Sequence, residues 1–377
     1  MGGAIIHEWM SAHGGSEKVF EAMSHAFPDA DLFTLWRDPG AVMGDRKIAE
    51  SWFSRTPLRR RKALALPLMP HTWRTLRSGR RYDWMLVSSH LFAHHARFPG
   101  ANRDIPKFVY AHTPARYIWT PELDFRGSNP AVRVASAYYR SMDRRRANEP
   151  VAIAANSACV QDRIRRFWDR DATVIYPPVP VEAIAESART GHGLSDADRR
   201  VIDGLPATFI LGASRFVSYK QLDKVISIGA LLDIPVVIAG RGPEEQRLRD
   251  VAASASVPAT FVISPSDALL HALYARSAAY MFPPVEDFGM MPVEAMAAGA
   301  PVVVNALGGA QESAGKSAAG VVADFADVSS VADRTRELID RGIRPTIEDV
   351  AEFSEARFIE RLQTWVAIEL GYEACRA

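Results

Sequence analysis

The chain has 377 residues, a formal net charge of +1 at pH 7, and hydrophobic (48%) and charged (24%) fractions that are ordinary for a globular protein. Its length exceeds what one hydrophobic core usually fills, so we expect two domains. No apolar run approaches the roughly 18 residues of a membrane span, and no secretory leader begins the sequence, so we expect a cytoplasmic protein. The two cysteines, Cys159 and Cys375, lie in no metal-binding motif and cannot form a disulfide framework, so we expect no metal site.

Taken in chain order, short apolar runs alternate with segments of helical period, which is typical of βαβ units and parallel sheets. The strands that we expect are residues 4–7, 84–88, 108–111, 151–155 and 173–176 in the first half, and residues 209–212, 236–239, 260–263, 279–282, 302–305 and 320–322 in the second. Three prolines among residues 177–180 disfavour both helix and interior strand, so we place a hinge there. The sequence therefore predicts an α/β protein of two doubly wound, Rossmann-like domains, residues 1–178 and residues 179–354.

A glycine pair follows the first predicted strand and opens a predicted helix. Gly14 and Gly15 would let backbone N–H groups approach an anion, with the partial positive charge of the helix N-terminus behind them. A tight strand-to-helix turn with Ser16 as N-cap explains the same residues without a ligand. Both interpretations stay open at this point.

Residues 55–81 carry nine Arg or Lys and no Asp or Glu, although the whole chain is nearly neutral. The cations are mixed with apolar residues such as Leu64 and Trp73, which fits a surface in contact with anionic lipid. An ordinary pair of helices with solvated arginines is the alternative. Nucleic acid would also attract cations, but the sequence contains no recognition module, so we expect no nucleic-acid partner.

A histidine ends the third strand predicted in the first half. His112 precedes Pro114, which breaks the chain, and lies where ligands bind in parallel α/β sheets. Its imidazole is a candidate hydrogen-bond donor or acid/base group. A structural histidine with satisfied hydrogen bonds is the alternative.

Two cations follow the first strand predicted in the second half. Arg215 can bind a phosphate through two N–H groups, and Lys220 adds a compact charge five residues later, so the pair suits a diphosphate. Two solvated surface cations are the alternative. The next strand ends at Gly240, which permits close approach of a ligand, but the third glycine of a nicotinamide-binding fingerprint is missing.

Residues 282–304 are the most informative segment of the chain. A strand ends at two prolines, Glu286 lies in the following loop, and Gly289 precedes a helix, predicted from about residue 291 to 298, that carries Glu294. The two carboxylates can accept hydrogen bonds from sugar hydroxyls, while N–H groups at the start of the helix hold a phosphate. One cleft could then bind both ends of a nucleotide-sugar. A capping carboxylate beside a solvated one explains either glutamate singly.

These segments together resemble the retaining glycosyltransferases of family 4. Members of that family have the GT-B fold, in which two Rossmann-like domains face a central cleft. The run His-Thr-Pro-Ala-Arg-Tyr-Ile-Trp from His112 is also similar to a subgroup of bacterial mannosyltransferases that build polysaccharides and lipid-linked glycans. The other residues that carry the resemblance are Gly14–Gly15, which look like the family's glycine loop, Arg215 with Lys220, which look like its phosphate-binding pair, and Glu286 with Glu294, which look like its E-x7-E motif.

The resemblance implies a role for each candidate residue. Arg215 and Lys220 would neutralise the diphosphate leaving group, so that neither a metal nor another cofactor is required. The family's lysine commonly precedes a glycine, whereas Lys220 precedes Gln221, which leaves the local turn open.

The sugar and the ribose would be held by the remaining candidates. Glu286 would accept hydrogen bonds from hydroxyls of the donor sugar and Glu294 from the ribose. His112 would contact the transferred sugar near its C6 hydroxyl, and the departing phosphate would take the proton of the acceptor. Further donors to sugar and phosphate would be the backbone N–H groups of Phe288, Gly289 and Met290.

The implied activity is that of a hexosyltransferase which transfers mannose from GDP-mannose to a lipid-linked or polysaccharide acceptor. The acceptor would bind residues 1–178 and the donor residues 179–354, and a helix at about 355–377 would pack back on the first domain by analogy with other GT-B chains. Contact through residues 55–81 would place the protein at the inner face of the cytoplasmic membrane. A retaining transferase with a UDP-sugar donor, a sugar epimerase of related fold, and a protein that binds nucleotide or glycan without turnover are the alternatives.

Overall fold

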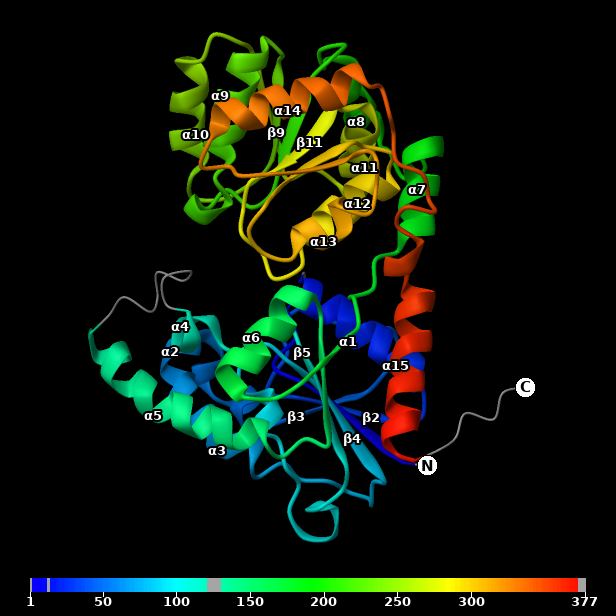
Figure 1. Ribbon diagram of the computed structural model, residues 1–377. Coiled ribbons are helices and arrows are strands. Elements are labelled where there is room, and N and C mark those ends of the chain that lie inside the picture. The colour runs from blue at the N-terminus through cyan, green and yellow to red at the C-terminus, as the bar shows by residue number, and fades with distance from the viewer. Residues whose placement is uncertain (1, 12–13, 121–129, 372–377) are drawn as a thin grey trace. The chain divides into compact units, whose positions relative to one another are not determined.

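The computed structural model describes residues 2–11, 14–120 and 130–371, and Figure 1 shows the course of the chain. Backbone contacts divide the chain into two compact units: unit 1 comprises Met1–Pro178 and Ala356–Ala377, and unit 2 comprises Val179–Glu355. Each unit holds one parallel sheet, so the expected α/β class with two Rossmann-like domains is confirmed. None of the helices in the described ranges is long and apolar enough to cross a bilayer.

Unit 1 contains a seven-stranded sheet in which neighbouring strands are parallel. The strand order reverses at β1, because β2 lies on one side of it and β4 on the other. In such sheets ligands bind beyond the carboxyl ends of the strands at the reversal. In sheet order the strands are β3 (Ile48–Glu50), β2 (Asp31–Thr34), β1 (Gly3–His7), β4 (Trp84–Ser89), β5 (Lys107–Ala111), β6 (Ala152–Ala155) and β7 (Thr173–Val174).

Helices cover both faces of the unit 1 sheet. Phe20 of α1 and Leu362 and Trp365 of α15 share one core, and Figure 1 shows these two helices side by side. Trp73 of α3 and Trp168 of α6 belong to the core on the opposite face. The helices are α1 (Gly15–Ala26), α2 (Lys62–Ala65), α3 (Met69–Trp73), α4 (Arg116–Trp119), α5 (Pro130–Ala147), α6 (Ala158–Trp168) and α15 (Glu355–Glu369), with 3-10 turns η1 (Trp52–Arg55), η2 (Pro57–Arg60), η3 (Leu66–Leu68), η4 (Ala93–His95) and η5 (Gly100–Asn102).

Unit 2 contains a six-stranded parallel sheet whose order reverses at β8. Its central strands are nearly continuous apolar runs, as expected of strands buried on both faces. In sheet order they are β10 (Ala259–Ile263), β9 (Val236–Gly240), β8 (Ile210–Ala213), β11 (Ala279–Phe282), β12 (Val302–Asn305) and β13 (Gly320–Ala323). The helices are α7 (Val181–Thr190), α8 (Asp196–Asp203), α9 (Leu222–Leu232), α10 (Glu245–Ala253), α11 (Asp267–Arg276), α12 (Met290–Ala297), α13 (Ala310–Ala314) and α14 (Val328–Asp340), with 3-10 turns η8 (Ser218–Lys220) and η9 (Ala351–Phe353).

Three details of unit 1 differ from the sequence-based expectations. Strands β2 and β3 were not expected, because they are short and include charged residues. The N-cap of α1 is Gly14, not Ser16, and its backbone is extended. Residues 55–81 form 3-10 turns and short helices rather than an ordinary helix pair, because prolines at positions 57, 67 and 70 interrupt the segment.

Candidate active site

The cations predicted to bind phosphate lie at one edge of the unit 2 sheet, together with a predicted carboxylate. Strands β8 and β11 are neighbours at the centre of the sheet, where the strand order reverses. The loop after β8 carries Arg215 and Lys220, and the loop after β11 carries Glu286. Because parallel strands have their carboxyl ends at the same edge, the two loops meet at the position where ligands of such sheets bind.

Lys220 and Glu286 form an ion pair that the sequence analysis did not predict. The Nζ atom of Lys220 lies 2.5 Å from Oε1 of Glu286, and only 9% of the lysine side chain and 23% of the glutamate side chain are exposed. The ammonium also lies 5.4 Å from the ring centroid of Tyr219 and 5.6 Å from that of Phe282. An ammonium has three N–H donors, so this bond leaves two that can reach phosphate oxygens.

The turn that places Lys220 includes a strained residue. Gln221 follows the lysine with φ +51° and ψ 39°, in the left-handed region that residues other than glycine rarely adopt. The conformation costs on the order of 1–2 kcal/mol for such a residue. The turn left open by the sequence therefore forms with glutamine, at a cost in backbone strain.

Arg215 lies at the exposed side of the same loop. Its Nη2 donates a hydrogen bond to the Tyr219 hydroxyl at 2.9 Å. The phenol thus orients the guanidinium, while the ring of the same tyrosine lies beside the Lys220 ammonium. Tyr219 was not predicted to be a site residue, although its position between Arg215 and Lys220 in the sequence could have indicated this.

The N-terminus of α12 adds backbone donors to unit 2. Gly289 is the N-cap, with φ +82°, and no side chain caps the helix. Phe288 is buried and Met290 is half-buried. Pro292 has no N–H group, so any backbone donors of this helix start that reach a ligand come from the residues before it. Glu294 is half-buried on the next turn of the helix.

Two buried tyrosines lie close enough to Glu294 to feel its charge. Burial raises the pKa of Tyr280 well above its ordinary value, and the carboxylate of Glu294 raises it further. Burial has the same effect on the pKa of Tyr274, to which Tyr280 and Glu294 add. The raised pKa values keep both phenols neutral at neutral pH. The Tyr280 hydroxyl donates to the Ala213 carbonyl oxygen at 3.0 Å and so supports the end of β8.

Glycines let neighbouring loops approach each other at this edge. A Cβ atom at Gly240, where φ is +140°, would overlap the Ser214 carbonyl oxygen in the loop that carries Arg215. A Cβ atom at Gly309 would overlap the Asp287 carbonyl oxygen, and the Gly309 N–H donates to the Glu286 carbonyl oxygen at 2.8 Å. Gly240 therefore shapes the Arg215 loop, and its predicted contact with a ligand stays a prediction. Gly309 was not among the predicted site residues, although it belongs to a glycine pair that follows a strand, a pattern visible in the sequence.

In unit 1, His112 belongs to a hydrogen-bonded chain with two buried residues. Its Nε2 lies 2.8 Å from the Ser88 Oγ, which lies 3.0 Å from Nδ1 of His7. His7 and Ser88 are in β1 and β4, where the strand order reverses. Burial lowers the pKa of His7 well below its ordinary value, and the nearby His90 and His112 lower it further. A neutral His7 and the Ser88 hydroxyl thus orient His112.

The residue after His7 is a buried carboxyl group. Glu8 accepts hydrogen bonds from the N–H groups of Leu91 and Ala93 at 2.8 and 2.7 Å. Burial raises the pKa of Glu8 to about 8, although these hydrogen bonds act in the opposite direction. Glu8 therefore ties the end of β1 to the segment after β4, and it is largely protonated at neutral pH.

The predicted glycine loop lies at the start of α1. Gly14 and Gly15 are exposed, whereas His13 lies outside the described residues. Glu17 of the first turn accepts the N–H of Ser11 at 3.0 Å, so a carboxylate is already present near this helix start. Binding of an anion by the two glycines stays a prediction.

Part of the cationic segment 55–81 serves the structure of unit 1. Arg74 Nη1 lies 2.6 Å from Glu149 Oε2, and Arg80 Nε lies 2.8 Å from Asp31 Oδ2. Arginines that pair with carboxylates of their own unit contribute less to the attraction of an external anion.

Two other arginines of the segment line a cavity of about 910 Å³ beside β3. Arg55 and Arg77 lie on its wall together with Trp52, which is 48% exposed. The lining also includes the hydroxyl-bearing side chains Ser51, Ser54, Thr72 and Thr75. The wall also includes Glu50, which pairs with Arg37. An aromatic ring, hydroxyls and charged groups together suit a sugar.

Comparisons with known proteins agree with this two-unit architecture. Residues 13–183 match the family model described as Glycosyltransferase Family 4, and residues 203–356 match the one described as Glycosyl transferases group 1. A comparison with curated proteins returns no match.

Solved structures of low sequence identity have the same fold. Sucrose-phosphate synthase from Thermosynechococcus elongatus is 16% identical, with a TM-score of 0.71 over 99% of this chain and 100% of that one. HepE of Anabaena, in complex with UDP and glucose, is 16% identical, with a TM-score of 0.66 over 96% and 99%. The lipopolysaccharide outer core galactosyltransferase WaaB is 16% identical, with a TM-score of 0.65 over 98% and 100%.

Two independent observations therefore agree. Both matching family models describe glycosyl transfer, and they cover most of the two units. The solved structures have the same pair of Rossmann-like sheets over nearly the whole chain. The chain is thus a glycosyltransferase of the GT-B type.

Proposed function

We propose that this glycosyltransferase transfers mannose from GDP-mannose to a lipid-linked or polysaccharide glycan, with retention of anomeric configuration and without a metal ion. The observation that carries the proposal is the Lys220–Glu286 pair in the loops after β8 and β11. A cation and a carboxylate at this edge are what the diphosphate and the hydroxyls of a nucleotide-sugar require. The similarity of the sequence from His112 to mannosyltransferases supports mannose as the sugar.

The cations act on the leaving group. Negative charge develops on the diphosphate as the bond to the sugar breaks, and Arg215 and Lys220 stabilise that charge. The bond from Lys220 to Glu286 fixes the ammonium before the donor arrives, so little reorganisation is needed in the transition state. A phosphate oxygen takes the proton of the acceptor hydroxyl as the new glycosidic bond forms.

The other residues orient the donor. Glu286 accepts hydrogen bonds from sugar hydroxyls, Glu294 accepts them from the ribose, and His112 contacts the transferred sugar near its C6 hydroxyl. Phosphate and sugar receive further hydrogen bonds from the backbone N–H groups of Phe288, Gly289 and Met290.

The acceptor binds unit 1 in this proposal. The cavity lined by Arg55, Arg77 and Trp52 is its candidate site, because it combines cations, hydroxyls and an exposed ring. Cationic residues of 55–81 would also hold the protein at an anionic membrane surface.

A UDP-sugar is the second candidate donor. HepE of Anabaena was solved with UDP and glucose, which favours that nucleotide by analogy of fold. GDP-mannose and a UDP-sugar would use the same predicted cations and carboxylates of the protein. A binding measurement is therefore needed to choose between these two donors.

A thermal-shift measurement with GDP, UDP, ADP and their sugar conjugates tests the donor, first with EDTA and then with magnesium. A rise in Tm with GDP and GDP-mannose that does not depend on the metal supports the proposal, because selective binding stabilises the native state. A rise with UDP-sugars alone overturns the choice of donor. Glu294→Ala should lose most of the shift, whereas Glu245→Ala, on an exposed ion pair of α10, should keep it.

Turnover separates an enzyme from a binding protein. The donor that raises Tm is incubated with candidate acceptors, and the product is examined by NMR for the anomeric configuration. An α-linked product from an α-linked donor supports retention, and an inverted product overturns it. Binding without transfer or hydrolysis for every acceptor would favour a non-catalytic protein, and interconversion of free UDP-sugars would favour an epimerase.

A further inference from the structure

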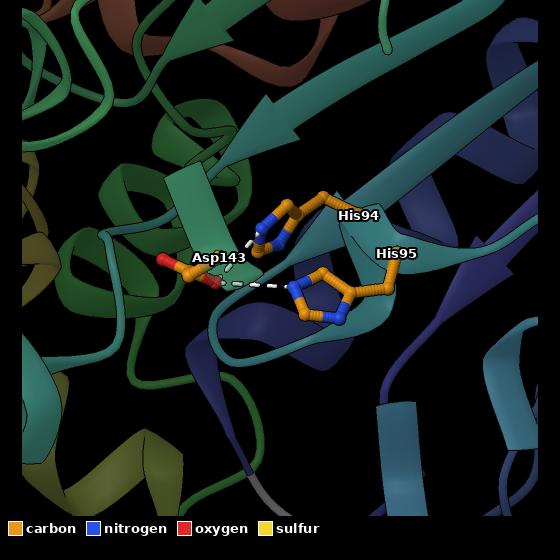
Figure 2. A group of neighbouring side chains, drawn as sticks. All are labelled: His94, His95 and Asp143. Atoms are coloured by element: carbon orange, nitrogen blue, oxygen red, sulfur yellow. Dashed lines mark hydrogen bonds and ion pairs between the residues drawn. The ribbon is translucent and has the colours of Figure 1, made fainter. Parts of the chain in front are cut away.

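A cluster of three fully buried polar side chains lies in unit 1, apart from the residues assigned above. His94 and His95 are the last two residues of η4, and Asp143 lies on α5. All three side chains are 0% exposed, and Figure 2 shows both imidazoles directed toward the same carboxylate. One donor atom from each lies within 4.8 Å of the others.

The distances suit ligands that share one ion. Asp143 Oδ1 lies 3.0 Å from Nε2 of His94 and 3.2 Å from Nε2 of His95. Zinc binds imidazole nitrogen and carboxylate oxygen at about 2.0–2.2 Å, which at tetrahedral angles places neighbouring ligand atoms roughly 3.3–3.6 Å apart. The two nitrogen-to-oxygen distances lie slightly below that spacing, so a small adjustment of the side chains would admit the ion.

The direction of the His94 ring distinguishes this arrangement from a simple hydrogen bond. Nε2 of His94 is buried and makes no hydrogen bond, even though Asp143 Oδ1 is only 3.0 Å away. The geometry of a hydrogen bond is therefore not met at this nitrogen. A buried imidazole nitrogen without a hydrogen bond, 3.0 Å from a carboxylate oxygen, is a candidate ligand for a cation.

Outer partners hold two of the three side chains in place. The other oxygen of Asp143, Oδ2, accepts the indole N–H groups of Trp119 and Trp168, both at 2.7 Å. Nδ1 of His94 lies 3.1 Å from the Ser89 hydroxyl. Metal ligands are oriented by such second contacts. The hydrogen bond between Nε2 of His95 and Oδ1 of Asp143 would give way to the two bonds to the ion.

The negative charge of the Asp143 carboxylate also favours a bound cation. Within the part of the chain that the structure describes, no lysine or arginine contacts the Asp143 carboxylate, whose partners are indoles and imidazoles. A buried carboxylate is costly unless a cation or several hydrogen bonds compensate it. The indole and imidazole hydrogen bonds offset part of this cost, and a divalent cation between Oδ1 and the two imidazoles would supply a compensating positive charge.

We propose that His94 Nε2, His95 Nε2 and Asp143 Oδ1 bind a divalent transition-metal ion, with zinc as the ion that best fits two imidazoles and one carboxylate. Zinc takes four ligands, so one more, such as a water molecule, completes the shell. The site links η4 to α5 inside the unit 1 core, and its role is structural. It departs from the expectation of no metal site, and it does not depend on the proposed donor or on metal-free transfer.

The first test measures metal content without using activity. The protein is expressed with added zinc, purified without chelator and analysed by mass spectrometry for metal per chain. The proposal expects close to one zinc per chain and a lower Tm after EDTA treatment, restored by zinc. A metal-free protein whose Tm changes with neither zinc nor EDTA would overturn it and leave a hydrogen-bonded network in its place.

Variants then locate the ion. His94→Gln and Asp143→Asn should lose the zinc, while His71→Gln, an exposed histidine of the same unit, should keep it. Ser89→Ala removes only the outer partner of His94 and should weaken zinc affinity by about 10–100-fold. Zinc retained by folded His94→Gln or Asp143→Asn would overturn the assignment.

A spectroscopic measurement on the wild type covers the case in which the ligand variants do not fold. Cobalt is exchanged for zinc, and the visible absorption and X-ray absorption spectra are recorded. Tetrahedral cobalt bands with scattering from two imidazoles support the site. Octahedral cobalt without imidazole scattering would overturn it.

Discussion

The Nζ atom of Lys220 lies 2.5 Å from Oε1 of Glu286, although the two residues are 66 positions apart in the chain. The pair joins the loops after β8 and β11, so a change in either residue alters the position of the other. Removal of the carboxylate frees a mostly buried ammonium, and removal of the ammonium frees a mostly buried carboxylate. We therefore expect a substitution at either position to disturb both side chains.

Lys220→Met should lower kcat by about 10²–10³-fold, because it removes one group that stabilises charge on the leaving diphosphate. Initial rates with the donor identified by thermal shift provide the measurement. Arg199→Met, an exposed cation of α8 in the same unit, is the matched control and should leave kcat unchanged. Equal kcat values for Lys220→Met and the wild type would remove the proposed role of the lysine.

Gln221→Gly should stabilise the protein by about 0.5–1 kcal/mol. Glycine adopts the left-handed conformation at this position without strain, and this gain exceeds the extra entropy that glycine has in the unfolded chain. Urea unfolding of the purified variants measures the difference, with Gln221→Ala as a control that keeps the strain. A destabilised glycine variant would show that the glutamine side chain makes a contact worth more than the strain.

Glu8 should make stability depend on pH. Because burial raises its pKa to about 8 from an ordinary value of 4.5, the folded protein binds more protons than the unfolded chain between these values. The contribution of this residue is complete below about pH 4.5 and is lost as the pH rises through about 8. The free energy of unfolding of the wild type, relative to Glu8→Gln, should therefore fall between pH 5 and pH 9. A constant difference over that range would contradict the raised pKa.

Glu149→Gln should destabilise unit 1 by on the order of 3 kcal/mol, because it leaves a buried ammonium without a counter-charge. Lys107 Nζ lies 2.9 Å from Glu149 Oε2, and only 5% of the lysine side chain is exposed. Burial lowers the pKa of Lys107 to about 8, against the opposing effect of Glu149. Urea unfolding measures the loss.

A double variant controls for the loss of other contacts of Glu149. Lys107→Met combined with Glu149→Gln removes both charges, so it should be less destabilised than Glu149→Gln alone. The opposite order would show that the arginines around Glu149, and not Lys107, account for the effect.

Much of the fold could be predicted because buried parallel strands are nearly continuous apolar runs. The run Val302-Val303-Val304 is such a strand, whereas β3 has only Ile48 buried beside two exposed residues, and no local pattern marks it. Packing against β2 decides that strand, and the sequence does not show this packing.

The candidate site likewise has features that could be predicted from the sequence and features that could not. Glu286 and Glu294 are eight residues apart and could be recognised as one motif, and their places in the loop after β11 and on α12 follow from local structure. The ion pair with Lys220, the clash that excludes a side chain at Gly309, and the convergence of His94 and Asp143 depend on contacts between distant segments. Local patterns contain no information on such contacts.

The last helix of the chain, α15, completes the core of the first unit. Trp365 packs against Phe108 of β5 with ring centroids 5.6 Å apart, and Gln363 donates to the Ala26 carbonyl oxygen at 2.7 Å. During synthesis, one face of the unit 1 sheet must therefore wait for about 180 further residues, the whole of unit 2, before its covering helix leaves the ribosome. Unit 2 can fold as a continuous segment in that interval, so the domain made second can be finished first, and a nascent chain halted near the hinge would expose apolar surface to chaperones.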